Sequence, residues 1–143
     1  MAIDNLIIRV ADWKTEKEAL SAIRRDVFIL EQKVPEEMEW DEYDQSSIHF
    51  IVTLENTALA TARLTLDGRI GRMAVRHPYR NQSIGSKLLA FILQTALDKN
   101  IKKLHLHAQV SAIGFYEKQG FSARGDVFYE ANIPHREMSK IIC

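Results

Sequence analysis

The sequence is poor in cysteine, proline and net charge, and each shortage excludes a class of protein. Cys143 is the only cysteine, which leaves no disulfide framework and no thiolate metal cage. Nineteen basic residues balance nineteen acidic ones, whereas a general nucleic-acid binder carries a basic excess. No apolar run approaches the length of a transmembrane helix, and the first residues lack a signal-peptide pattern. We therefore expect a cytoplasmic protein that binds neither nucleic acid nor membrane.

Nothing in the chain divides it into parts. There is no internal repeat and no Pro/Gly/Ser-rich linker, and the three prolines fall in expected loops. A length of 143 residues suits one domain, because half of it would hold too small a core. Apolar residues at 46% and charged residues at 27% are ordinary for a globular protein. We expect a single domain over residues 1–143, with Cys143 as a tail residue rather than a nucleophile.

Hydrophobic periodicity in the first half predicts one helix among several strands. Apolar segments predict strands at 6–10, 48–54, 58–66 and 70–75, with turns at 55–56 and 67–68 that are short enough for hairpins. Thr15 and Glu18 fit a capping box for a helix that ends near Glu31. Residues 35–47 are acidic and are predicted to be irregular.

The second half alternates helices and strands. Residues 83–99 predict a long helix, whose apolar stripe suits burial of one face against a sheet. Ile84, Leu88, Leu89, Ile92 and Ala96 form that stripe. A strand at 104–108, a short helix at 112–118 capped by Ser111, and strands at 123–130 and 136–141 follow. This order favours an α/β (α+β) fold, with a mixed sheet and helices on both of its faces.

The most informative segment is the polar loop 80–85, Arg-Asn-Gln-Ser-Ile-Gly, between a strand and the long helix. At such a junction the unpaired N–H groups and the positive end of the helix dipole converge on one point. The segment therefore predicts a site for a phosphate-bearing cofactor. An ordinary strand-to-helix turn with a solvated arginine is the alternative.

Two motifs resemble the GNAT superfamily of N-acetyltransferases, which bind acetyl-coenzyme A. In its pattern Gln/Arg-x-x-Gly-x-Gly/Ala, Arg80 and Gly85 fit, and Ser83 replaces the first glycine. Residues 115–121, Phe-Tyr-Glu-Lys-Gln-Gly-Phe, are similar to the family's Phe-Tyr-x-x-x-Gly-Phe. The chain resembles the ElaA-like branch in particular, through Val27-Phe28, Glu31-Gln32, Val34-Pro35, Glu39-x-Asp41, Asp44, His49, Ile133-Pro134-His135 and Met138. The resemblance implies a mixed, mostly antiparallel central sheet.

The resemblance also implies which residues bind the co-substrate, acetyl-CoA. Backbone groups of Met73, Ala74 and Val75 hold the pantetheine arm and polarise the thioester, and Gln109 hydrogen-bonds the arm. The pyrophosphate rests on a loop and helix start formed by Arg80, Asn81, Gln82, Ser83, Ile84, Gly85 and Ser86. A positive φ at Ser83 would cost on the order of 1 kcal/mol, which a hydrogen bond from its hydroxyl to a phosphate would offset.

The implied reaction is direct transfer of an acetyl group to a primary amine in a ternary complex. By the resemblance, Tyr116 is the general acid that protonates the leaving thiolate. Glu31 and His135 rank first as general base, ahead of the other candidates Glu39, Asp41, His49 and His77. The acceptor is a small-molecule or peptide amine that the resemblance does not identify, and the sequence allows a homodimer.

Three alternatives accompany this hypothesis. The first is a non-catalytic acyl-CoA binding or sensing module, which the replacement of glycine by Ser83 favours. The second is a metal site at His105 and His107, although no third ligand is within reach of them in the sequence. The third concerns the acidic stretch 36–44, which either attracts a cationic amine beneath Trp40 or Tyr43 or forms a solvated loop. A doubly wound nucleotide-binding domain is disfavoured, because the loop lacks a dinucleotide fingerprint.

Overall fold

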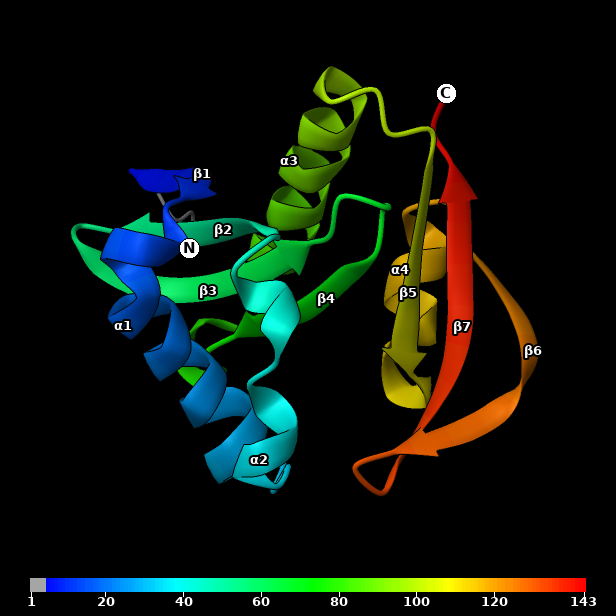
Figure 1. The fold of residues 1–143 in the computed structure, drawn as a ribbon, viewed down its shortest axis with the longest axis horizontal. Coiled ribbons are helices and arrows are strands. Elements are labelled where there is room, and N and C mark those ends of the chain that lie inside the picture. The colour runs from blue at the N-terminus through cyan, green and yellow to red at the C-terminus, as the bar shows by residue number, and fades with distance from the viewer. Residues whose placement is uncertain (1–4) are drawn as a thin grey trace.

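A computed structural model describes residues 5–143 as two antiparallel sheets with helices packed around them (Figure 1). The strands are β1 (Leu6–Ala11), β2 (Ile48–Leu54), β3 (Thr57–Leu64), β4 (Ile70–Val75), β5 (Lys103–Gln109), β6 (Ser122–Glu130) and β7 (Ile133–Ile141). The first sheet has the order β1-β2-β3-β4, and the second has the order β5-β7-β6. Figure 1 shows the two sheets as separate layers whose strands run in different directions.

Within residues 5–143, the backbone pairing between the two sheets lies at one end of β4 and β5. Arg69 and His105 form a single parallel bridge there, and the His105 N–H donates to the Gly68 carbonyl at 3.0 Å. Beyond this bridge, no ladder pairs β4 with β5 in the described part of the chain. The strands therefore diverge, and the edge of β4 that faces β5 keeps backbone groups that no strand pairs.

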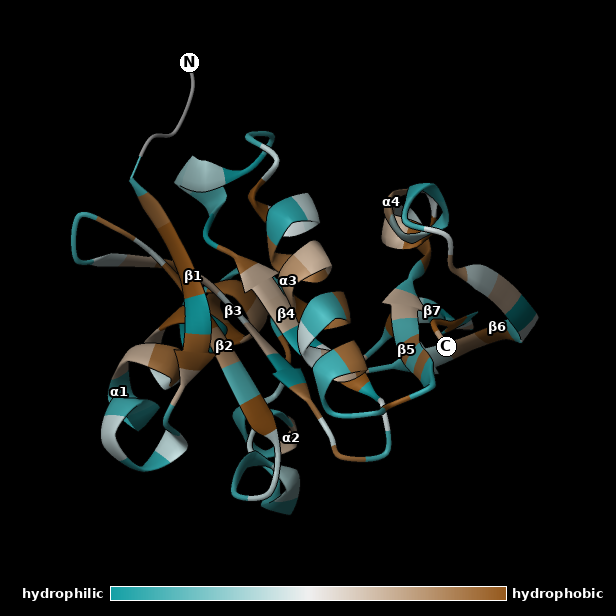
Figure 2. Cartoon of the chain, turned by 90° about the horizontal axis from the view of Figure 1, so that it is seen from above, coloured by the Kyte–Doolittle hydropathy of each residue, from teal (hydrophilic) through white to brown (hydrophobic). Residues whose placement is uncertain are grey.

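The main helices are α1 (Trp13–Arg24), α3 (Ile84–Asp98) and α4 (Ile113–Lys118), and α1 continues as a π-helical segment, Arg25–Glu31. Packing places α1 and α3 on opposite faces of the first sheet. On β2, Ile51 packs with Leu20 of α1, whereas its neighbour Phe50 points to the other face and joins the cluster beneath α3. Figure 2 shows the same arrangement, in which the first sheet lies between α1 and α3. Within residues 5–143, no helix is both long enough and apolar enough to cross a bilayer.

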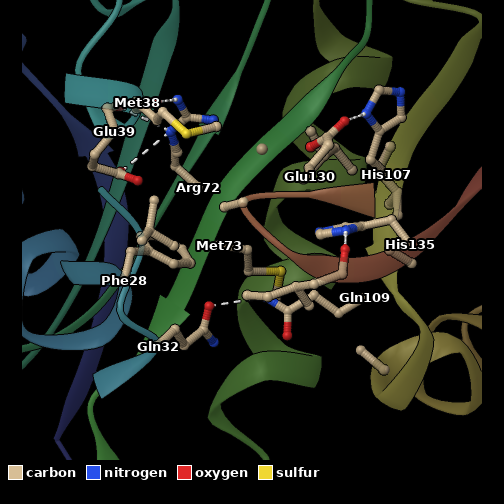
Figure 3. Close-up of a pocket in the computed structure, with 18 of the residues that line it drawn as sticks. Phe28, Gln32, Met38, Glu39, Arg72, Met73, His107, Gln109, Glu130 and His135 are labelled. Carbon is tan, nitrogen blue, oxygen red and sulfur yellow. Dashed lines mark hydrogen bonds and ion pairs between the residues drawn. The ribbon is translucent and has the colours of Figure 1, made fainter. Parts of the chain in front are cut away.

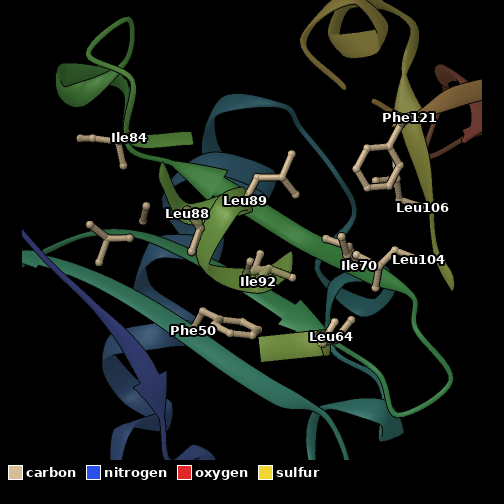
Figure 4. Packing of buried hydrophobic residues seen from close by; sticks show 14 of the residues in the cluster. Phe50, Leu64, Ile70, Ile84, Leu88, Leu89, Ile92, Leu104, Leu106 and Phe121 are labelled. Carbon is tan, nitrogen blue, oxygen red and sulfur yellow. The ribbon is translucent and has the colours of Figure 1, made fainter. Parts of the chain in front are cut away.

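The core joins the two sheets through α3. All five residues of its predicted stripe are buried, which confirms the 3.6-residue pattern. Around them lie buried side chains from both sheets and from the segment after α4 (Figure 4). These side chains include Phe50, Leu64, Ile70, Leu104, Leu106 and Phe121. One continuous cluster of buried side chains therefore spans the junction between β4 and β5, although few hydrogen bonds cross it.

Several local predictions are wrong in detail. Asp12, not Thr15, caps α1, and its carboxylate accepts the Lys14 N–H at 2.9 Å. Ser111 lies inside a 3₁₀ turn and does not cap α4. The last strand begins at Ile133 rather than at residue 136, because the connection after β6 is a tight turn. Residues 35–47 are not wholly irregular, since they contain α2 (Glu36–Glu39) and a 3₁₀ turn, Glu42–Asp44.

Ser83, the N-cap of α3, has the left-handed backbone conformation that the family's glycine would favour. Its φ is +64°, and its side chain makes no capping hydrogen bond. A non-glycine residue in this region is strained, because its Cβ crowds the backbone. We expect Ser83→Gly to raise the free energy of unfolding by on the order of 1 kcal/mol in urea titrations.

Ser86→Gly is the matched control for this prediction. Ser86 lies inside α3, where glycine costs backbone entropy and should lower stability by about 0.5 kcal/mol. Equal losses in the two variants would show that Ser83 carries no strain.

Candidate active site

A cavity of about 260 Å³ opens where β4 and β5 diverge (Figure 3). Its walls come from β4, β5, the turn between β6 and β7, the π-helical segment and α2. Polar residues that line it are Gln32, Glu39, Arg69, Arg72, His107, Gln109, Tyr116, Glu130 and His135. The cavity thus combines residues from distant parts of the chain at the one place where the sheets separate.

A β-bulge at Arg72 shapes the β4 wall of the cavity. Arg72 has a φ of +51°, and the register with β3 shifts between Thr61 and Arg63. Past the bulge, the Arg76 N–H donates to the Leu59 carbonyl at 2.9 Å. Because antiparallel residues alternate in direction, Val75 then points its N–H and C=O away from β3, toward the gap between the sheets.

Met73, Ala74 and Val75, the residues predicted to hold the pantetheine arm, therefore differ in their surroundings. Ala74 is buried and pairs with Thr61, so it belongs to the ladder with β3. The Met73 side chain lines the cavity, and Val75 directs its backbone toward the gap. β4 is therefore buried along its pairing with β3, while its other edge has backbone groups that no strand pairs. The bulge and the divergence of β4 from β5 free that edge.

The loop before α3 forms an uncapped helix start. Ser83 provides no capping side chain, and the first hydrogen bond of the helix is donated by Lys87 to the Ser83 carbonyl at 3.1 Å. The N–H groups of Ile84, Gly85 and Ser86 precede it, at the positive end of the helix. Asn81 and Gln82 lie on the same loop, where the Gln82 amide donates to the Pro78 carbonyl at 3.4 Å.

The Arg80 side chain braces this loop instead of extending into solvent. Its Nε donates to the Val75 carbonyl at 2.8 Å, and its two terminal nitrogens bind the Glu31 carboxylate at 2.5 and 2.7 Å. This fork ties the loop 80–85 to both β4 and the end of the π-helical segment. The hydrogen bond from Arg80 lowers the pKa of the Glu31 carboxyl, and Glu31 does not line the cavity.

Tyr116 lies at the end of the cavity nearest the start of α3. A Cβ on Gly85 would lie 3.4 Å from the Phe115 ring and 3.9 Å from the end of the Met73 side chain, so the start of α3 lies beside both residues. The Tyr116 hydroxyl lies 3.7 Å from the Met73 sulfur, and the ring contacts Phe115 and Phe121 edge to face. Burial raises the pKa of Tyr116 to about 12, so the phenol keeps its proton at neutral pH.

His135 has a defined tautomer at the cavity wall. Its Nδ1 lies 2.6 Å from the Ile133 carbonyl, and since a carbonyl oxygen only accepts, Nδ1 carries the hydrogen. In the neutral ring, Nε2 is then left with a lone pair. The ring stacks on Phe128 and extends into the cavity (Figure 3). His135 is therefore placed to accept a proton.

Other candidate bases lie in different surroundings. Glu39 lines the cavity, and burial raises the pKa of its carboxyl against the opposing effect of Arg72 and Arg24. His49 stacks on Trp13 away from the cavity, and burial lowers its pKa. His77 is exposed in the 3₁₀ turn that precedes the loop 80–85.

The acidic stretch is only in part the solvated loop that composition allows, because Glu36, Glu37 and Glu42 are exposed whereas its other carboxylates are paired within the protein. Three arginines neutralise its carboxylates Glu39, Asp41 and Asp44. The pairs are Arg24 with Glu39 and Asp44 at 2.8 and 2.7 Å, Arg63 with Asp41 and Asp44 at 2.7 and 3.0 Å, and Arg72 with Glu39 and Asp41 at 3.2 Å each. Trp40 packs over the Arg24 guanidinium at 5.0 Å rather than over a substrate amine.

Sequence reasoning missed this buried ion network, although one signal for it was present. Arg24 falls on the helical stripe that includes Leu20 and Val27, and Arg63 interrupts an otherwise apolar strand. A charge at a position that the pattern assigns to the core requires a partner. The pattern cannot name that partner, because the carboxylates belong to another part of the chain.

Two further polar contacts line the cavity. The Gln109 amide donates to the Gln32 side chain at 2.9 Å, which joins β5 to the turn after the π-helical segment. His107 lies 2.6 Å from Glu130, whereas His105 lies apart, 4.0 Å from Asp67. Among residues 5–143, no three metal-ligating side chains form a group. Gln32, Arg69 and Glu130 were not among the predicted site residues.

The architecture is a mixed α+β fold in which two antiparallel sheets splay apart around a cavity, and this is the GNAT fold. Residues 11–142 match the family model described as an acetyltransferase (GNAT) domain, and the chain belongs to that family. Both the resemblance and the expected fold class are thereby confirmed.

Named relatives are similar to the chain over most of its length. YyaT from Bacillus subtilis is 36% identical over 131 residues, which are 87% of this chain and 88% of that protein. ElaA from Escherichia coli is 28% identical over 85% of each chain, and its crystal structure superposes with a TM-score of 0.84. An acyl-CoA N-acyltransferase from Pseudomonas aeruginosa superposes with a TM-score of 0.85 at 29% identity, over 94% of this chain and 99% of that one.

Proposed function

We propose that this protein transfers an acetyl group from acetyl-CoA directly to a primary amine within a ternary complex. The observation that carries the proposal is that three groups lie around Met73, at one end of the cavity. These groups are the Val75 backbone directed into the gap, the uncapped start of α3 and the buried, protonated phenol of Tyr116. Membership of the GNAT family and similarity to an acyl-CoA N-acyltransferase support the same reaction.

The residues fit an acyl-CoA co-substrate, because unpaired N–H groups at the start of α3 suit a pyrophosphate. Asn81, Gln82 and Ser83 would flank it, and Arg80 with Glu31 holds the loop in position rather than contacting the phosphates. When bound, acetyl-CoA supplies an acyl group on a thiolate leaving group. The Val75 N–H points toward the gap in which that thioester would lie, and Gln109 lies on the opposite wall.

Proton transfers then follow from the state of each side chain. His135 Nε2 takes one proton from the acceptor's ammonium group and passes it to solvent. As the nitrogen–carbon bond forms, the Val75 N–H donates to the carbonyl oxygen, a kind of contact worth about 3 kcal/mol in acyl transfer. As the carbon–sulfur bond breaks, Tyr116 donates its proton to sulfur, and it regains a proton from the new amide nitrogen. The products are the N-acetyl amine, the free thiol and one proton released to solvent.

Calorimetric titration with acetyl-CoA, followed by thiol release with a panel of amines, tests this proposal. We expect saturable binding together with thiol release that depends on an amine. Binding without release on any acceptor would favour a non-catalytic acyl-CoA sensor, in which Ser83 stands where enzymes of the family have glycine. No heat and no shift in melting temperature would refute both functions.

A further inference from the structure

The charged residues that line the cavity form two groups. Glu39 and Arg72 bind each other and the buried ion network, so their charges are already matched. Arg69 and Glu130 are outside that network. Among the described residues, Arg69 has no carboxylate within 4.0 Å, and the only basic partner of Glu130 within that distance is His107.

Arg69 and Glu130 compete for one nitrogen of His107. His107 Nδ1 lies 2.6 Å from Glu130 Oε1 and 3.0 Å from Arg69 Nη2. That nitrogen either carries a hydrogen to donate to Glu130 or has a lone pair to accept from Arg69. If Nδ1 carries the hydrogen, Arg69 has no acceptor on His107. If Nδ1 has the lone pair, Glu130 has no donor on it. A ligand in the cavity that carries both an anionic and a cationic group would supply the partner that His107 cannot give to Arg69 and Glu130 at once.

We propose that this cluster binds the head group of an α-amino acid, which is the acceptor of the proposed transfer reaction. The ligand's carboxylate binds Arg69, and its α-ammonium binds Glu130. Once the carboxylate accepts from Arg69, His107 Nδ1 is free to donate to Glu130, so every group has a partner. One cation and one anion side by side complement a zwitterion better than they complement a simple amine.

The length of the cavity selects which amine is acetylated. Figure 3 shows Glu130 and His107 at one end, and Met73, Gln109 and Gln32 at the other. His107 and Gln109 are two residues apart on one face of β5, a separation of about 7 Å. The thioester belongs at the Met73 end, beside Tyr116. An α-amine held at Glu130 is too far from it, whereas a side-chain amine about three or four methylene groups further on reaches it.

The cavity also offers apolar surface to such a methylene chain, because Met73 and Ile133 line it and are only partly buried. We therefore infer that the acceptor is a diamino acid of the lysine or ornithine type, acetylated on its side-chain nitrogen.

A series of acceptors tests this inference on the wild-type protein. L-lysine and L-ornithine carry all three groups, cadaverine lacks the carboxylate, 6-aminohexanoate lacks the α-ammonium, and norleucine lacks the side-chain amine. We expect kcat/KM for lysine or ornithine to exceed that for cadaverine and 6-aminohexanoate by about tenfold or more, since each loses a charged contact. Norleucine should not react, and mass spectrometry should locate the acetyl group on the side-chain nitrogen.

Two variants test the two proposed contacts, one at Arg69 and one at Glu130. Arg69→Gln should reduce the preference for lysine over cadaverine to near unity, and Glu130→Gln should do the same for lysine over 6-aminohexanoate. Arg124→Gln and Glu117→Gln are the matched controls, because both residues are exposed and lie outside the cavity lining. These controls should leave both preferences unchanged.

The outcomes separate this inference from the proposed function. Turnover of cadaverine as fast as lysine, or acetylation of the α-nitrogen, would overturn the diamino acid inference and leave the transfer reaction intact. If neither these amines nor any amine of the wider panel caused thiol release, both the diamino acid inference and the transfer reaction would be overturned.

Discussion

Replacing Tyr116 by phenylalanine should lower kcat by about 10²-fold or more while the Kd for acetyl-CoA changes by about twofold at most. The phenol donates to the Met73 sulfur at 3.7 Å, and burial raises its pKa from the ordinary 10.0 to about 12, so it stays protonated well above neutral pH. Without it the leaving thiolate must depart unprotonated or wait for water. Thiol-release kinetics and calorimetric titration measure the two quantities separately. Tyr129→Phe, at a residue that is 70% exposed, is the matched control and should change neither.

Alkaline unfolding of the same variant checks the protonation state of Tyr116. The folded-state pKa of about 12 lies above the ordinary value of 10.0, so the contribution of this group to stability is complete below pH 10. It is lost as the pH rises from about 10 toward 12, because only the unfolded chain ionises readily. Wild type should therefore lose stability over this range more steeply than Tyr116→Phe. Undiminished turnover in Tyr116→Phe would exclude Tyr116 as the acid. Loss of stability with pH at the same rate in wild type and variant would contradict the raised pKa.

Replacing Arg24 by methionine should lower the free energy of unfolding by about 3–5 kcal/mol, the largest loss of stability that we expect from a single substitution in this chain. Arg24 is fully buried and donates to both Glu39 and Asp44. Methionine keeps much of its volume, so the loss reflects two carboxylates left without that cation. Urea titration at neutral pH measures it.

The neighbouring Arg25 provides the control for this prediction. Arg25 pairs with Glu36 at 2.8 Å at the surface, where water screens the pair, so Arg25→Met should have little effect. The difference in the free energy of unfolding between wild type and Arg24→Met should also become smaller as the pH falls toward 4.5. Burial raises the pKa of Glu39, and without Arg24 that carboxyl takes up a proton even more readily in the folded state. A deficit that stays constant with pH would contradict the electrostatic origin of the loss.

The buried ion network explains why the acidic stretch was misjudged from sequence. Its carboxylates pair with arginines that are 15 to 33 residues away along the chain, on α1, β3 and β4. The local composition therefore suggested that these carboxylates are exposed to solvent, whereas in the fold three arginines from distant elements pair with them. The network also fixes Glu39 and Arg72 at one wall of the cavity, which leaves Arg69 and Glu130 as the charges available to a ligand.

The elements themselves followed from local patterns. The stripe on α3 and the strands at 48–54 and 70–75 agree with prediction, because periodicity and short turns are properties of adjacent residues. The positive φ at Ser83 was likewise expected as a condition of the family's loop geometry. Helix caps were less predictable, since Asp12 and Thr15 are both good capping residues, and the structure forms the cap at Asp12, whose N–H in turn donates to Glu16.

Residue patterns alone determined the family and pointed to the loop 80–85 and Tyr116 as candidate site residues, because each depends on motifs within a few residues of one another. Only the tertiary structure decided where β4 and β5 part, which side of β4 keeps free backbone groups, and that Arg80 holds Glu31. It also brought Arg69, His107 and Glu130 together on one wall. The physical reason is that a sequence specifies which groups can bond, whereas sheet register and helix packing decide which of them meet.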